Sequence, residues 1–162
     1  MKKVSMMIVL MIAVCSIGIL SFIRFHTPLV SGAIASSADK QSVVISIGNQ
    51  GFSHIKIHDV QINNDEEPVD KKIQVSHPLQ GFIIADRFDG SAIEYGLTDI
   101  KDVTIKPNTS PSSQLEKLNN GTATKEDLSY GLTIINNQEI REVMISYSYL
   151  GMAFEKSVSL PH

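Results

Sequence analysis

The feature that most constrains this chain is an uncharged, strongly apolar stretch near its N-terminus. Residues 4–23 are 20 consecutive side chains without a charge, VSMMIVLMIAVCSIGILSFI. About 20 residues of α-helix cross a hydrocarbon layer roughly 30 Å thick, and a helix satisfies its own backbone hydrogen bonds there. Lys2 and Lys3 precede the stretch and Arg24 follows it, which predicts a cytoplasmic N-terminus and an extracytoplasmic remainder. We therefore expect residues 1–24 to be a transmembrane anchor in a cell membrane.

Two other interpretations of this stretch remain open. A cleaved secretory signal needs a small-residue site, and Ala33-Ile34-Ala35 has that pattern, although it lies well beyond the apolar run. A lipoprotein signal would end at Cys15, but the branched Val14 precedes that cysteine and the apolar run continues past it. An uncleaved anchor accounts for the length of the run better than either alternative.

The charge and cysteine content of the remainder exclude several classes of function. After residue 35 the chain has 11 basic and all 17 of its acidic residues, a net charge of −6. Such a domain repels phosphate backbones, which argues against nucleic acid as a partner. Cys15 is the only cysteine and lies in the apolar stretch, so the rest of the chain offers no disulfide, thiolate ligand or thiol nucleophile.

The composition divides the chain into three parts. Residues 25–41 contain Pro28, Gly32 and a run of small side chains, without the alternation of a strand or the charge pattern of a surface helix. This composition predicts a short tether. Residues 42–162 are then a single extracytoplasmic domain, because a typical domain contains about 100–150 residues.

Alternating apolar side chains predict several short strands in the first half of the domain. Residues 42–49 and 54–62 have this pattern around the turn 49–51, which predicts an antiparallel hairpin with a bulge near His58 and Asp59. The apolar residues at 73 and 75 predict a short edge strand, and the continuous apolar run in 81–88 predicts an interior strand. Val103 and Ile105 mark another strand.

The last third has the clearest strand pattern. Tyr130, Leu132 and Ile134 alternate before a turn, and a second strand then places four apolar or aromatic side chains on one face: Val143, Ile145, Tyr147 and Tyr149. A third strand contains Phe154, Val158 and Leu160. Residues 114–120 can form one or two helical turns only. Seven or eight short strands without a long helix predict an all-β fold, an antiparallel β-sandwich of the immunoglobulin-like type.

Two segments carry a family resemblance. The stretch VVISIGNQGFSHIKIHDVQIN resembles the opening hairpin of bacterial immunoglobulin-like sandwich domains, including the water-stress and desiccation-related kind, and ISYSYLGMAFEKSVSL resembles their last strands. The cysteine-free composition, rich in Lys, Ile and Asn, is similar to that of exported proteins of Gram-positive bacteria. The resemblance implies a bacterial single-pass membrane protein with a sandwich ectodomain, and it transfers no functional residue.

The candidate site residues are few. His54 and His58 are candidate metal ligands, but because Lys56 lies between them and no third ligand is evident, we expect solvent-facing histidines instead of a site. The acidic loop 63–70 has oxygen ligands but no glycine at the position that a calcium loop requires. Asp86, after two apolar residues, is the only acid in a setting that favours an altered pKa.

These observations predict a binding or scaffolding module of the cell envelope. We expect no catalytic residue, no cofactor and no metal centre, and a second envelope protein as partner. A ligand-binding or metal-binding envelope protein is the alternative, and a hydrolase comes after it. Tyr147 and Tyr149 share a face with Val143 and Ile145, so we expect them in the core and not on a contact surface.

Overall fold

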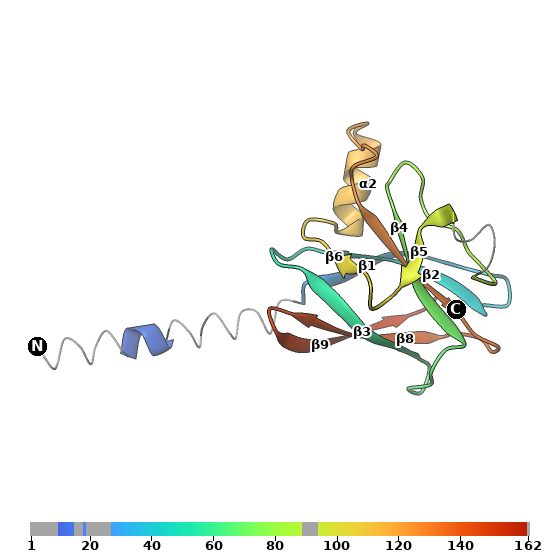
Figure 1. Cartoon of the computed structure of the whole chain (residues 1–162), viewed down its shortest axis with the longest axis horizontal. Helices are drawn as coiled ribbons and strands as arrows, with labels where there is room; N and C mark the ends of the chain where they lie inside the picture. The colour runs from blue at the N-terminus through green and yellow to red at the C-terminus, as the bar shows by residue number, and fades with distance from the viewer. Residues whose placement is uncertain (1–9, 15–17, 19–26, 89–93, 162) are drawn as a thin grey trace, which may run out of the picture.

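Two antiparallel β-sheets pack face to face in this protein (Figure 1). The computed structural model describes residues 10–14, 18, 27–88 and 94–161. Sheet A has five strands in the order β1-β2-β7-β4-β5, and sheet B has four in the order β6-β3-β8-β9. The predicted all-β sandwich is thereby confirmed. The strands are β1 (Leu29–Ser36), β2 (Ser42–Asn49), β3 (Ile55–Ile62), β4 (Asp70–Ser76), β5 (Leu97–Asp99), β6 (Thr104–Ile105), β7 (Ser129–Ile135), β8 (Glu142–Tyr149) and β9 (Met152–Ser159).

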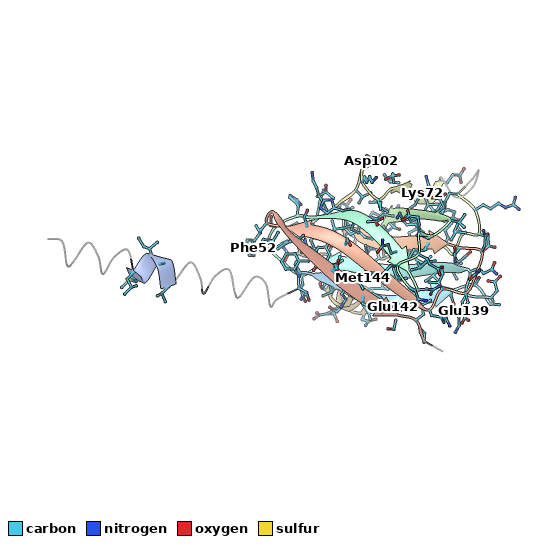
Figure 2. All side chains as sticks on the ribbon, turned by 90° about the horizontal axis from the view of Figure 1, so that it is seen from below. Phe52, Lys72, Asp102, Glu139, Glu142 and Met144 are labelled. Atoms are coloured by element: carbon cyan, nitrogen blue, oxygen red, sulfur yellow. The ribbon has the colours of Figure 1, made fainter. Side chains whose placement is uncertain are left out.

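The core lies between the two sheets and is built from the inward side chains of every long strand. Ile45, Ile73 and Leu132 of sheet A and Ile57 and Ile145 of sheet B are almost completely inaccessible to solvent. Each such side chain contributes about 1.5–3 kcal/mol when it is fully buried. Tyr147 and Tyr149 are in this core, as the alternation predicts. Figure 2 shows the opposite side of β8, where Glu142 and Met144 lie on the outer surface of sheet B.

The segment predicted as a tether is largely a strand, so that prediction is wrong. Residues 29–36 form β1, which pairs with β2 along its length and closes one edge of sheet A. The strand pattern is hidden because only Leu29 and Ile34 face the core, and a bulge between Ser31 and Ile34 breaks the alternation. The folded domain therefore begins near Thr27 and not at Ser42.

The predicted hairpin of residues 42–62 is also wrong, although both of its strands exist. β2 belongs to sheet A and β3 to sheet B, so the turn 49–51 passes between the sheets. Buried Asn49 stabilises this crossing, because its side-chain amide donates to the carbonyls of Ser53 at 2.7 Å and Ile105 at 3.2 Å. Its Oδ1 accepts the N–H of Gly51 at 2.8 Å. The predicted bulge is confirmed between Ile57 and Asp59.

Two further strand predictions differ from the structure. β4 is not an edge strand, because it pairs with β7 on one side and with the short β5 on the other. Residues 81–88 form no strand in the part of the chain that is described. Instead they cover the outer face of sheet A, where the carboxamide of Gln74 bonds to both backbone groups of Ile83. A side chain thus supplies the hydrogen bonds that a neighbouring strand would have supplied.

The helix α2 (Pro111–Asn119) is longer than the one or two turns expected. Ser110 is its N-cap, and Pro111 occupies the first turn, where the missing N–H costs nothing. Gly121, at a φ of 67°, follows the C-terminus and its N–H bonds to the carbonyl of Leu118. Ser110 and Pro111 precede residues 114–120, so the helix begins earlier than the helical turns expected from the sequence.

Most of the predicted anchor, residues 4–23, lies outside the described residues. Residues 10–14 and 18 are helical. Among the described residues, no helix is both long and apolar enough to cross a membrane.

Candidate functional site

An open cavity of about 690 Å³ lies on the outer face of sheet A. Its floor is formed by β1, β2 and the start of β7, one wall by α2, and the other wall by residues 77–84. We call this cavity the outer cleft. Its volume is in the range of small-molecule sites, about 300–1,000 Å³. The lining residues include Val30, Ala33, Ala35, Val44, Ser46, His77, Phe82, Ile84, Gln114, Leu115 and Leu118.

Small residues on the floor allow both walls to approach the sheet closely. A Cβ added to Gly32 would lie 2.5 Å from Cβ of Pro111, and one added to Gly131 would lie 2.7 Å from Cδ1 of Phe82. A Cβ on Gly48 would collide with the backbone carbonyl of Thr109. Glycine therefore positions α2 and the 77–84 segment directly on the sheet, and the outer cleft is the space left between them.

The helical wall lines the outer cleft with Gln114, Leu115 and Leu118, in addition to Pro111 and Ser112 of its first turn. Gln114 and Leu118 are four residues apart on one face, and Leu115 lies beside them. Leu115 is 57% exposed and Leu118 42% exposed, so both present apolar surface to the outer cleft. Lys117, in the last turn, bonds to Asp127 at 2.5 Å and ties the helix to the loop before β7. The helix is thereby fixed at both ends.

The opposite wall is held to the sheet by side-chain hydrogen bonds. The Gln74 amide donates to the carbonyl of Ile83 at 2.6 Å and to Oγ1 of Thr133 at 2.7 Å, and its Oε1 accepts the N–H of Ile83 at 3.0 Å. Ser76 donates to the carbonyl of Gly81 at 2.8 Å. These bonds leave Ile84, 43% exposed, directed toward solvent beside the cleft. The wall is therefore a fixed surface with an exposed apolar rim.

The lining has no charged side chain, but it contains unpaired polar atoms. None of the lining residues is Lys, Arg, Asp or Glu. Gln114 is only 6% exposed, and its Oε1 is buried without a hydrogen-bond partner among the described residues, as is Nδ1 of His77. A buried polar atom without a partner costs about 1–3 kcal/mol, so a ligand that supplied the missing bond would relieve that cost. The outer cleft therefore suits an uncharged, mostly apolar ligand with a hydrogen-bonding group.

The predicted metal candidates do not converge. His54 and His58 are both exposed; His54 lies just before β3, and His58 lies at the bulge between Ile57 and Asp59. Across the described part of the chain, no group of three His, Cys, Asp or Glu side chains is placed to hold a metal. Asp86 is exposed and accepts a hydrogen bond from Oγ of Ser42 at 2.8 Å.

One acidic residue of the loop 63–70, Glu67, pairs with Lys71 of β4. Nζ of Lys71 lies 2.6 Å from Oδ1 of Asp59 and 2.6 Å from Oε1 of Glu67, and it also donates to the carbonyl of Val60 at 2.9 Å. The hydrogen bond from Lys71 holds the pKa of Asp59 below its ordinary value. Burial acts to lower the pKa of Lys71, but its hydrogen bonds to the two carboxylates outweigh burial and raise that pKa. The cluster joins β4 of sheet A to β3 of sheet B.

No protein-family model, curated protein or solved structure matches this chain. The outer cleft is therefore interpreted from its geometry alone. Sequence reasoning missed it because residues 81–88, part of one wall, were predicted as an interior strand, and only one or two helical turns were expected at residues 114–120, in the other wall. One signal was available: Pro111 after Ser110, with apolar residues at 115 and 118, indicates the start of an amphipathic helix.

Proposed function

We propose that this protein is a binding module held at the outer surface of a cell membrane, and that the outer cleft takes up an uncharged amphiphile with an aliphatic chain. The observation that carries this proposal is the uncharged, mostly apolar lining of the outer cleft, which includes Gln114, whose buried side-chain oxygen has no hydrogen-bond partner among the described residues. An enzyme activity has no comparable support.

The absence of charge argues for a neutral ligand. A carboxylate or phosphate in the outer cleft would lose its hydration without a cationic side chain to replace it, and burying an unpaired charge is very costly. An aliphatic chain loses nothing of this kind and gains about 0.8 kcal/mol for each buried CH₂ group. A hydroxyl or amide on the ligand would donate to Oε1 of Gln114.

The orientation of the floor argues against a peptide. The outer cleft lies on the face of sheet A, and the backbone groups of β2 already pair with β1 and β7 on its two sides. A peptide bound there would bury its own N–H and C=O groups without partners, whereas peptides added to sheets pair with a strand edge. An aliphatic chain has no backbone polar groups to satisfy.

Three features support the position at the membrane. The apolar stretch 4–23 has more positive charge before it than after it, which favours an extracytoplasmic domain. Cleavage after Ala35 would remove most of β1 from sheet A, which favours an uncleaved anchor. The immunoglobulin-like relationship is part of this proposal, and the passage of β2 to β3 and of β7 to β8 between the sheets supports it.

Photolabelling of the full chain in phosphatidylcholine nanodiscs tests the proposal. The probe is a monoacylglycerol with a diazirine in its acyl chain, and a fatty acid with the same diazirine is the charged comparison. We expect peptide mass spectrometry to find monoacylglycerol adducts on α2 and residues 77–84, with at least fivefold fewer adducts from the fatty acid. Gln114→Leu should reduce labelling by the monoacylglycerol.

Leu115→Glu and Val69→Glu form a matched pair of variants for this experiment. Each replaces an exposed apolar residue by a carboxylate, but only Leu115 lines the outer cleft, whereas Val69 is 58% exposed and precedes β4. We expect Leu115→Glu to abolish labelling at the cleft and Val69→Glu to leave it unchanged. Adducts confined to residues 4–23, or adducts at the cleft that survive Leu115→Glu, would sink the proposal.

A further inference from the structure

The most exposed aromatic side chain of the described domain lies where the chain enters the domain. Phe52 is 75% exposed and occupies one end of the sandwich, with Glu139 toward the other (Figure 2). Leu150, 42% exposed, is at the turn between β8 and β9, and the ring of Phe52 makes an edge-on contact with Tyr149 next to it, with centroids 5.9 Å apart. We call residues 27–28, 50–54 and 150–151 the Phe52 end.

Hydrogen bonds and close contacts join the parts of the Phe52 end. Gln50 donates from its backbone N–H to the carbonyl of Pro28 at 3.0 Å and from its side chain to the carbonyl of Thr27 at 3.0 Å. The hydroxyl of Tyr149 accepts the N–H of Phe52 at 3.1 Å. Because these bonds fix the 50–53 turn beside Thr27, Phe52 cannot move far from the point where the chain enters the domain.

The sequence leaves little distance between this point and the apolar stretch. Three residues, 24–26, separate Ile23 from Thr27, and such a connection spans at most about 14 Å. If residues 4–23 cross a bilayer, then Thr27 lies close to its surface, and so does the turn that is bonded to it. At this depth, the apolar ring of Phe52 can pack against acyl chains at the membrane–water interface.

The charge distribution also favours a position of the Phe52 end near the bilayer. The Phe52 end contains no acidic residue, in a domain with a net charge of −6. The acidic side chains of the loops at the far end include Asp39, Glu139 and the 65–67 triplet, and hydrogen bonds connect those loops, such as that from Asn63 to the carbonyl of Glu139 at 3.1 Å. Carboxylates oppose contact with the bilayer, so the Phe52 end, whose own residues carry no charge, can approach it better than the far end. The exposed Glu155, which lines a surface pocket with Thr27, must then stay in the aqueous layer.

We propose that the Phe52 end is a membrane-contact surface, with Phe52 and Leu150 inserted into the interfacial region of the bilayer that holds the anchor. This inference rests on the anchor proposed above. It fixes the orientation of the domain on the membrane. Gln50, two residues from Phe52, also lines the outer cleft, so an aliphatic ligand has a short path from the bilayer to its site.

Nitroxide accessibility in phosphatidylcholine nanodiscs tests this proposal on the full chain. In a Cys15→Ser background, single cysteines replace Leu150, Glu139 and Leu10, and each spin label is exposed to oxygen and to a water-soluble nickel chelate. We expect the label at 150 to be shielded from the chelate at least threefold more than the label at 139. Phe52→Glu should return the label at 150 to the accessibility found at 139, and Val69→Glu should not.

The label at position 10 separates failure of this inference from failure of the anchor. A label at 10 that is accessible to oxygen but not to the chelate lies in the bilayer. In that case, a label at 150 with full chelate access overturns the membrane-contact surface and leaves the anchor standing. Full chelate access at position 10 would overturn both proposals about the membrane.

Discussion

At the scale of single residues, the three glycines on the outer face of sheet A determine how closely its cover can approach. Gly32 and Gly48 lie under the start of α2, and Gly131 lies under the ring of Phe82. None of the three has a positive φ. These glycines are therefore needed for the space that a missing Cβ leaves and not for their conformational freedom. A Cβ at any of the three positions would collide with α2, the residues before it, or Phe82.

We expect Gly131→Ala to destabilise the domain by about 1–3 kcal/mol, because the new Cβ forces the Phe82 ring out of place. Urea unfolding of the full chain in detergent, followed by circular dichroism, measures this. Phe82→Ala in the same chain removes the obstacle, so the double variant should be more stable than the sum of the single effects predicts. If the two effects on the free energy of unfolding are strictly additive, then the added Cβ at position 131 does not collide with the Phe82 ring.

We expect a larger loss of stability from a substitution at Gly48. Its added Cβ would meet a backbone carbonyl, which cannot rotate away as a ring can. Gly48→Ala should therefore cost more than Gly131→Ala in the same unfolding experiment, with no rescue by Phe82→Ala. Equal costs for the two variants would contradict this explanation of the floor.

At the scale of secondary-structure elements, Lys71 provides a polar link between the two sheets. It belongs to β4 in sheet A, and its ammonium group contacts Asp59 on β3 in sheet B and Glu67 in the connecting loop. Its side chain is 15% exposed, whereas those of Asp59 and Glu67 are 42% and 66% exposed. Solvent therefore screens the carboxylates, and we expect the pairing to contribute about 1 kcal/mol.

This link predicts a pH dependence with a definite sign. Because the folded-state pKa of Asp59 is lowered, its contribution to stability is present above the ordinary value of 3.8 and is lost as the pH falls through the lowered pKa. Lys71→Met should thus lower the free energy of unfolding at pH 7, and the difference from the wild-type chain should shrink below about pH 4. Urea titrations of the two chains at a series of pH values measure the loss of stability at pH 7 and its change with pH.

Lys125→Met is a suitable control for the pH experiment, because Lys125 is an exposed lysine in the loop after α2. It should leave the pH dependence unchanged. If the difference in free energy of unfolding between wild type and Lys71→Met stays constant from pH 7 to pH 3, then Lys71 does not lower the pKa of Asp59.

At the scale of the whole molecule, the chain combines an acidic sandwich with an apolar N-terminal stretch and a connection of only a few residues. The recognition of β1 as a strand shortens the connection from the predicted 25–41 to a few residues before Thr27. If the proposed anchor crosses a membrane, such a domain has little freedom to leave the surface of that membrane, and any ligand or partner must be within reach of that surface.

The proposed orientation across the membrane predicts an asymmetric labelling pattern. With Cys15 replaced by Ser, a cysteine at Thr122, exposed after α2, should react with a membrane-impermeant maleimide in intact spheroplasts. A cysteine in place of Lys3 should react only after the membrane is permeabilised. Protection of the cysteine at 122 until permeabilisation would place the domain in the cytoplasm and contradict the positive-inside assignment.

Local pattern alone predicted a large part of the fold. The apolar alternation in β7 and β8 predicts a buried face for each strand, whereas β9 keeps the pattern only in part because Lys156 interrupts it. The bulge near Asp59 follows from the one-residue shift of phase in β3. The burial of Tyr147 and Tyr149 follows from the same alternation. These properties depend only on neighbours in sequence, which is why they were accessible without a structure.

Pairing partners and the outer cleft were decided by tertiary structure. The turn 49–51 has the same residues whether it joins two strands of one sheet or crosses between sheets, and only the positions of Ile105 and Tyr149 distinguish the two. β1 was missed because it is an edge strand of small residues. Residues 81–88 were misassigned because side chains of β4, and not a neighbouring strand, bond to the backbone of Ile83 and to the carbonyl of Gly81. Sequence determines which face of a strand is apolar; it does not determine what covers the other face, because that depends on contacts between residues distant in the chain.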